Sequence, residues 1–190
     1  MLKTPERSEG RTYTSLRDVC GLSGAWPPAD GFPKTEGRAT MAIYHLSAQV
    51  ISAGVGKSAV ASAAYRRATN MVREATGKVL TYEGKQHVAH TELALPEQTP
   101  VWFRTGIDGR SENAASAYLW NAVERKEGLK GTGYAMEMNI ALPVELTLEQ
   151  NIDLARDWIE SAITAQGMVA DWALHDVPGN PHIHVMIPLR

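Results

Sequence analysis

Residues Val169 to Leu189 read VADWALHDVPGNPHIHVMIPL, and their pattern is the strongest structural signal in the chain. Two runs rich in apolar residues flank a loop at residues 176–181 that contains two prolines and a glycine. Short apolar runs bounded by such turn residues are typical of β-strands, and the short loop between them indicates a hairpin. We therefore predict paired strands over Val169 to His175 and His182 to Leu189.

Three histidines lie in this hairpin: His175, His182 and His184. Side chains alternate between the two faces of a strand, so His182 and His184 point the same way. Closing the hairpin places His175 opposite His182, with Cβ atoms about 5 Å apart. The three imidazoles are thus predicted to converge on one face, while the other face keeps the apolar residues Trp172, Leu174, Ile183, Val185 and Ile187.

Three neutral imidazoles leave coordination positions open for water or substrate, which is typical of a catalytic metal site. Asp176 is adjacent and is the candidate to orient an imidazole. The alternative is a polar hairpin whose exposed histidines bind nothing. A single histidine would favour that alternative, but three on a shared face favour a metal. His45, His87 and His90 fit surface positions better than a site.

The rest of the chain predicts an α+β fold with helices on one face of a sheet. Alternation favours a half-buried strand from Ala42 to Val50 and another from Tyr134 to Leu142, with Glu137 on the polar side of the latter. Short strands are predicted over Lys78 to Tyr82 and His87 to Leu95. Helices are predicted from Ser58 to about Glu74, from Ser111 to Gly128 and from the capping box at Thr147 to Gly167.

Residues 1–40 show no sustained period and hold four prolines, so we predict an irregular or disordered leader before a single domain at 41–190. The chain has one cysteine, Cys20, which suits a reducing compartment and excludes an intrachain disulfide. With no secretory signal and no apolar run of membrane-spanning length, we expect a cytoplasmic protein without membrane insertion.

The net charge of the chain is −2, so it lacks the positive excess that is common in nucleic-acid-binding proteins. A DNA partner therefore has to be argued from specific residues.

Gly56-Lys57-Ser58 resembles part of a phosphate-binding loop, but that motif needs a glycine where the chain has Ile51. The following helix is more informative, because Tyr65 is a lone phenol among alanines, followed by Arg66 and Arg67. Small neighbours let a polymer backbone come close, and guanidinium groups bind phosphate in a bidentate manner. A helical tyrosine is usually a packing residue, but a metal-polarised phosphate needs an attacking group.

Four segments occur in a characteristic order: Met41 to Leu46, the Lys57-Ser58-Ala59 run into Tyr65, Glu137 to Pro143, and Gly179 to His184. Together they resemble the MobA/MobL family of conjugative relaxases, including the N-terminal part of TraA-type transfer proteins, over about residues 41–190. Family members continue past the histidine strand, so we expect a domain that is incomplete at the C-terminus.

The resemblance implies a five-stranded antiparallel sheet of the histidine–hydrophobic–histidine type, with the tyrosine helix lying over it. It implies that Tyr65 attacks single-stranded DNA at a plasmid transfer origin and that His175, His182 and His184 hold Mn²⁺ or Mg²⁺. Glu137 is the further candidate catalytic residue, as a proton acceptor or beside the metal ligands; a solvated surface carboxylate is the alternative. Lys57, Arg66 and Arg67 are the expected DNA-binding residues. Accessory mobilisation proteins and a coupling protein are the further partners implied.

Three other functions stay open at this point. A DNA- or protein-binding fragment with an inactive metal site would form no covalent adduct through Tyr65. A metal-dependent hydrolase would cleave with activated water and without any tyrosine linkage. A rolling-circle replication initiator would share the tyrosine chemistry, although the position of the tyrosine ahead of the histidines resembles a relaxase more.

Overall fold

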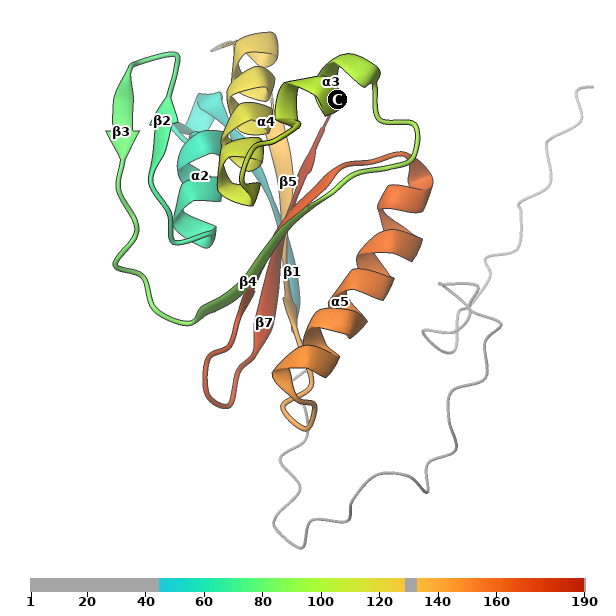
Figure 1. Cartoon of the computed structure of the whole chain (residues 1–190). Helices are drawn as coiled ribbons and strands as arrows, with labels where there is room; N and C mark the ends of the chain where they lie inside the picture. Colours follow the sequence, from blue (N-terminus) through green and yellow to red (C-terminus); the bar gives the residue numbers. More distant parts are fainter. Residues whose placement is uncertain (1–44, 129–132, 190) are drawn as a thin grey trace, which may run out of the picture. The chain divides into compact units, whose positions relative to one another are not determined.

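The computed structural model describes residues 45–128 and 133–189, and the predicted leader at 1–40 lies outside this part. Its centre is one five-stranded sheet in the order β1-β5-β7-β6-β4, in which all neighbouring strands are antiparallel (Figure 1). This confirms the expected α+β fold class. The strands are β1 (Leu46–Ser52), β4 (Val88–Ala94), β5 (Gly133–Ala141), β6 (Ala170–His175) and β7 (His182–Pro188).

A separate two-stranded hairpin and several helices complete the described part of the chain. The hairpin pairs β2 (Met71–Arg73) with β3 (Lys78–Leu80). The helices are α2 (Ala59–Arg66), α3 (Val101–Ile107), α4 (Glu112–Glu127) and α5 (Leu148–Ala162), with short 3₁₀ turns η2 (Ala53–Val55) and η3 (Thr164–Gln166). In the described residues, no helix is both long and apolar enough to cross a bilayer.

Helices cover both faces of the sheet, which corrects the expectation that they lie on one face. Helices α2 and α4 lie on one side and α5 on the other (Figure 1). The reason lies in the central strand β7, where Val185 and Met186 are both buried although they point to opposite faces. A strand that is apolar on both faces needs a packing layer on each side.

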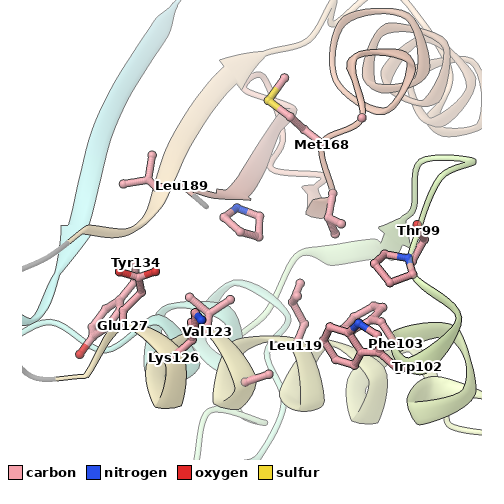
Figure 2. A pocket seen from close by; sticks show the side chains of 15 residues that line it. Thr99, Trp102, Phe103, Leu119, Val123, Lys126, Glu127, Tyr134, Met168 and Leu189 are labelled. Atoms are coloured by element: carbon pink, nitrogen blue, oxygen red, sulfur yellow. The ribbon is translucent and has the colours of Figure 1, made fainter.

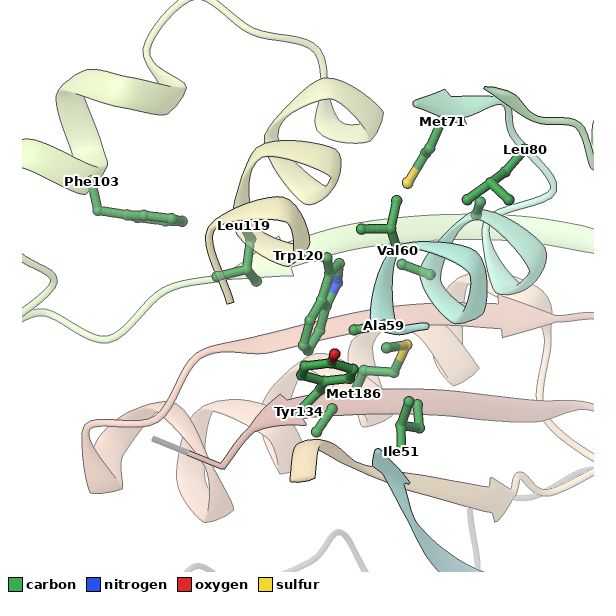
Figure 3. Close-up of a cluster of buried hydrophobic side chains, with 13 residues drawn as sticks. Ile51, Ala59, Val60, Met71, Leu80, Phe103, Leu119, Trp120, Tyr134 and Met186 are labelled. Atoms are coloured by element: carbon green, nitrogen blue, oxygen red, sulfur yellow. The ribbon is translucent and has the colours of Figure 1, made fainter. Parts of the chain in front are cut away.

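The core beneath α2 and α4 is built around Trp120 and Tyr134, which pack with Met186 of β7 and Ile51 of β1 (Figure 3). Small residues in α2, such as Ala59 and Ala63, let that helix approach the sheet closely. On the opposite face, α5 buries Ala155 and Ile159 against the apolar side of the histidine hairpin: Trp172, Leu174, Ile183, Val185 and Ile187. The predicted division of the hairpin into a histidine face and an apolar face is confirmed.

The helix predicted from Ser58 to about Glu74 is wrong in its second half. Ser58 does cap α2, accepting a hydrogen bond from the backbone of Ala61, but the helix ends at Arg66. Ala68 then takes a positive φ of 48°, which breaks helical geometry. The chain turns into β2 instead, because Met71 and its partner Leu80 both bury their side chains in the core under α2.

At the periphery, one prediction fails and one element was not predicted. The first strand is not half-buried: Leu46 and Val50 are 51% and 53% exposed in the described structure. Strand β1 is the edge of the sheet and pairs only with β5, while α5 packs on the central strands. Helix α3 was not predicted at all, because its seven residues are too short to show a helical period.

Candidate metal and nucleophile site

The hairpin register brings the three histidines together as the alternation predicts. His175 of β6 pairs directly with His182 of β7, and His184 follows two residues later on the same face. One nitrogen of each imidazole lies within 4.8 Å of one nitrogen of the other two. Ring centres are 4.7 to 5.2 Å apart. The convergence is confirmed, whereas metal binding itself stays a prediction.

In each imidazole, one ring nitrogen forms a hydrogen bond with an oxygen atom that can only accept. Nε2 of His175 donates to the backbone carbonyl of Arg66 at 2.8 Å, and Nδ1 of His182 donates to the carbonyl of Asn180 at 2.8 Å. Nδ1 of His184 lies 3.2 Å from Oε1 of Glu137. An acceptor fixes the proton on the nitrogen it contacts and leaves the second nitrogen with a free lone pair. This is the arrangement that three metal-binding imidazoles require.

These acceptors replace the one predicted from adjacency in the sequence. Asp176 is exposed, and the three contacts described above come from two backbone carbonyls and a glutamate on another strand. Burial lowers the pKa of His175 to about 4, although its hydrogen bond to Arg66 opposes this. Burial also lowers the pKa of His184, against the opposing effect of Glu137. Both imidazoles are therefore neutral at pH 7, as metal ligands must be.

Glu137 of β5 is buried at 3% exposure, so the alternative of a solvated surface carboxylate is wrong. Its carboxylate accepts hydrogen bonds from His184, Arg66 and Gln49. Burial alone would raise the pKa of Glu137, but the hydrogen bonds and charges of His184 and Arg66 outweigh it and hold the pKa at about 2. The group is thus a stable anion between the histidine cluster and α2.

Tyr65 lies near the C-terminal end of α2 and is 46% exposed, unlike the alanines that anchor this helix. Its ring contacts Tyr82 edge-on, with ring centres 5.5 Å apart, and the ammonium nitrogen of Lys85 lies 4.0 Å from the ring centre. Tyr65 is therefore not the packing residue that a helical tyrosine usually is. An exposed phenol on a buried helix is available to an external substrate.

Arg66 joins the tyrosine helix to the histidine cluster. Its carbonyl accepts the hydrogen bond from His175, and its Nε donates to Glu137. The carbonyl is available because the last carbonyls of an α-helix have no partner within the helix. Two contacts of Arg66, the residue after Tyr65, thus hold α2 against the histidine cluster.

The prediction that Arg67 binds DNA is wrong. Its side chain is 1% exposed and pairs with Asp171, whose carboxylate also accepts hydrogen bonds from Ser116 and Trp120. The helical period separates neighbours by about 100°, so Arg66 faces the site while Arg67 points into the core. Arg67 anchors α2 and cannot reach a phosphate in this structure.

Of the two other predicted DNA-binding residues, Lys57 is exposed, while Arg66 is partly exposed and donates to Glu137. Both line a hollow of about 470 Å³ that also contains Tyr65, with Arg73 and Lys78 as further cations. Lys57 and Lys78 are exposed, and Lys57 donates to Gln49 at 3.1 Å. A local basic groove of this kind is compatible with a net charge of −2.

Two residues around Tyr65 were missed by the sequence analysis. Tyr82 and Lys85 come from the segment between β3 and β4; Tyr82 was predicted as the end of a strand and Lys85 lay between two predicted strands. Burial and the charge of Arg66 lower the pKa of Lys85, while Glu137 opposes this. Nothing in the linear sequence connects this lysine to Tyr65, twenty residues earlier, so only the fold identifies it.

A larger hollow of about 650 Å³ lies between α3, α4 and the end of β7 (Figure 2). It is lined mainly by apolar side chains, including Trp102, Phe103, Leu119 and Met168, with Lys126 and Glu127 at its edge. It includes no residue that the sequence analysis assigned to the site.

Comparison with known proteins gives a consistent picture. Residues 57–190 match the model of the MobA/MobL family. A probable conjugal transfer protein TraA of Sinorhizobium fredii is 47% identical over 150 residues, and a conjugal transfer protein TraA of Rhizobium radiobacter is 48% identical over the same length. Each match covers 79% of this chain but 14% of the relative, so the chain spans about a seventh of these proteins.

Two further matches extend the comparison. A mobilization protein MobL of Acidithiobacillus ferridurans is 39% identical over 71% of this chain and 32% of its own length. A solved structure described as "Molecular Basis of Vancomycin Resistance Transfer in Staphylococcus aureus" superposes with a TM-score of 0.68 at 31% identity. It covers 78% of this chain and 71% of the other.

Proposed function

This chain belongs to the MobA/MobL family, and on that premise we propose that it nicks one strand of DNA at a plasmid transfer origin by tyrosine transesterification. The observation that carries the proposal is the double contact of Arg66, which holds the helix of exposed Tyr65 against three converging imidazoles. A nucleophile beside a metal-binding face is the arrangement that metal-assisted phosphoryl transfer requires.

The three imidazoles fit a divalent metal, since each has its second nitrogen free. The ligands would be Nδ1 of His175 and Nε2 of His182 and His184. We propose Mn²⁺ or Mg²⁺ as the ion, and of these two Mg²⁺ has the stronger requirement for oxygen ligands and bound water. The bound ion would polarise the phosphate and offset its developing negative charge.

In the proposed reaction, the Tyr65 oxygen forms a bond to the scissile phosphorus and its proton passes to solvent. The bond from phosphorus to the 3′ oxygen breaks, and that oxygen leaves with the electron pair and takes up a proton. The products are a 5′-phosphotyrosine and a free 3′-hydroxyl. Because the ester bond is conserved, the reverse reaction can rejoin the strand.

Glu137 has a positioning role in this scheme rather than that of a general base. A carboxylate with a pKa of about 2 is a weak proton acceptor at pH 7. Its contacts with His184 and Arg66 instead orient one metal ligand and the residue that follows the nucleophile. Lys57 and Arg66 are the proposed phosphate-binding residues.

The experiment uses single-stranded oligonucleotides that cover the transfer origin, labelled at the 3′ end and incubated with the protein and Mn²⁺. A 5′-phosphotyrosine keeps the 3′ fragment on the protein, so the label should shift to protein size on a denaturing gel. Tyr65→Phe removes one oxygen and should abolish the shift without changing fold or metal affinity. A labelled adduct in this variant would assign the nucleophile to another tyrosine.

His182→Ala provides the contrasting variant. It leaves an incomplete ligand set, so we expect metal affinity and adduct formation to fall together. Cleavage without any adduct in the wild-type protein would favour a hydrolase that uses activated water. Binding of the oligonucleotide without cleavage would favour an inactive DNA-binding fragment.

The partners follow from the same proposal. We place the reaction in the cytoplasm, with accessory mobilisation proteins and a coupling protein that deliver the nicked strand. Co-purification of the chain with origin DNA and such proteins from plasmid-bearing cells would test this assignment.

A further inference from the structure

Lys85 lies in the segment between β3 and β4, in a turn that also holds Tyr82. The backbone N–H of Lys85 donates to the carbonyl of Tyr82 at 3.2 Å, which closes a four-residue turn from Tyr82 to Lys85. The two ends of this turn are the residues that contact the Tyr65 ring from outside α2. One short segment thus presents two side chains to the exposed tyrosine.

The two contacts meet the ring differently. Tyr82 packs at an interplanar angle of 87°, with ring centres 5.5 Å apart. The Lys85 ammonium lies 4.0 Å from the ring centre, whereas the guanidinium carbon of Arg66 lies 5.9 Å from it. A cation within about 6 Å of an aromatic face is attracted to it, and the attraction strengthens at short distance and with desolvation. Lys85 is therefore the closer of the two cations at this ring.

No ion pair joins Lys85 to a carboxylate in the part of the chain that the structure describes. The side chain is nonetheless only partly exposed and stands near the charge of Arg66. A desolvated lysine without a carboxylate partner is costly, so its place on the Tyr65 ring needs another reason. Glu137 attracts this cation without forming an ion pair with it, and the Tyr65 ring is the attractive surface that the ammonium contacts.

We propose that Lys85 is a positioning residue for Tyr65, whose ammonium holds the phenol ring in the orientation needed to attack a phosphate. This inference rests on the proposed function for its kinetic consequence, but the contact itself belongs to the folded protein. The ring of Tyr65 is otherwise half exposed near the end of a short helix, with Tyr82 packed edge-on against it. Lys85 restricts the ring further before DNA binds.

The test compares Lys85→Met and Lys85→Arg with Lys126→Met, which makes the same change on an exposed position of α4 beside the apolar hollow. Single-turnover adduct formation is measured against oligonucleotide concentration. Lys85→Met should lower the saturating rate roughly tenfold, with a smaller effect on the half-saturating concentration. Lys85→Arg should recover most of the rate, because guanidinium also binds aromatic faces. Lys126→Met should match the wild type.

A saturating rate of Lys85→Met within twofold of the wild type would overturn the proposal, as would an arginine variant as slow as the methionine one. Melting temperature should stay unchanged in all three variants, which separates positioning from misfolding. A second readout needs no activity. In protein with ¹³C-labelled tyrosine, the Tyr65 ring signal, assigned with Tyr65→Phe, should move in Lys85→Met and not in Lys126→Met. If the wild type forms no adduct, the proposed function fails, while an unmoved signal would reject the role of Lys85.

Discussion

The histidine hairpin and the tyrosine helix lie against each other but are held in place by different means. Strands β6 and β7 occupy the middle of the sheet, and their histidines are aligned by adjacent residues in one ladder. Helix α2 has eight residues and is held by partners far away in the sequence. Its N-terminus is bound by Glu124, which accepts from Ser58 and the backbone of Val60.

The other end of α2 depends on two adjacent arginines that point in different directions. Arg66 pairs with Glu137, 71 positions away, and Arg67 pairs with Asp171, 104 positions away. An isolated helix of this length is unstable in water, so these contacts and the packed alanines supply its stability. The strand positions of the three histidines are thus set within one hairpin, whereas Tyr65 is positioned by contacts from distant parts of the chain.

The largest expected effect is on the free energy of unfolding, when Asp171, the distant partner of Arg67 at the end of α2, is replaced. Asp171→Ala leaves the buried Arg67 charge with only the exposed Glu112, at 3.8 Å, as an ion-pair partner, and it removes the acceptor for Ser116 and Trp120. We expect the free energy of unfolding to fall by about 3–5 kcal/mol, as measured by urea denaturation. The control Asp153→Ala, at an exposed ion pair with Arg156, should change it by less than about 1 kcal/mol. Equal effects would show that the buried pair does not hold the helix.

The second prediction concerns the histidine hairpin and acid. Burial lowers the pKa of His175 from 6.5 to about 4, so between these values the unfolded chain binds a proton that the folded chain does not. The stability of the metal-free protein should therefore be complete above pH 6.5 and decline as pH falls toward 4, by about 3 kcal/mol from this group. Denaturation midpoints at pH 7 and pH 5 test it. His175→Gln should flatten this window, and an unchanged slope would assign the loss to other groups.

The smallest expected effect is on Mn²⁺ affinity and concerns Glu137, which contacts both the histidine hairpin and the end of α2. Glu137→Gln keeps the shape of the side chain but removes the charge that orients His184. We expect Mn²⁺ affinity to fall by about 10–100-fold, measured by isothermal titration calorimetry. Gln49→Ala removes a different partner of Glu137 without touching an imidazole, so its effect should be smaller. If both variants bind Mn²⁺ like the wild type, Glu137 contributes only to the packing of α2.

The different directions of the Arg66 and Arg67 side chains could not be predicted from the sequence pattern. Both carry the same charge at adjacent positions, and the phosphate-binding prediction treated them alike. The direction of each side chain depends on how α2 is rotated on the sheet, which is set by the buried alanines and by Asp171. The same rotation exposes Tyr65, so its availability could be expected from family resemblance but not from helical periodicity.

Alternation in the strands of the histidine hairpin was enough to predict its faces, because the register of two paired strands needs only their sequence and the length of their loop. The capping box at Thr147 and the cap at Ser111 likewise marked the starts of α5 and α4 correctly. These features are local: each depends on residues within a few positions of one another, or across one tight turn.

The sequence by itself determined the strands of the hairpin, the shared face of His175, His182 and His184, and the family to which the chain belongs. Only the tertiary structure decided that helices cover both faces, that α2 stops at Arg66, that Glu137 is a buried anion and that Lys85 contacts Tyr65. The physical reason is the separation along the chain of the residues that determine each feature. Backbone geometry repeats every two or 3.6 residues and can be read along the chain, whereas burial, ion pairing and ring contacts depend on segments that meet only after folding.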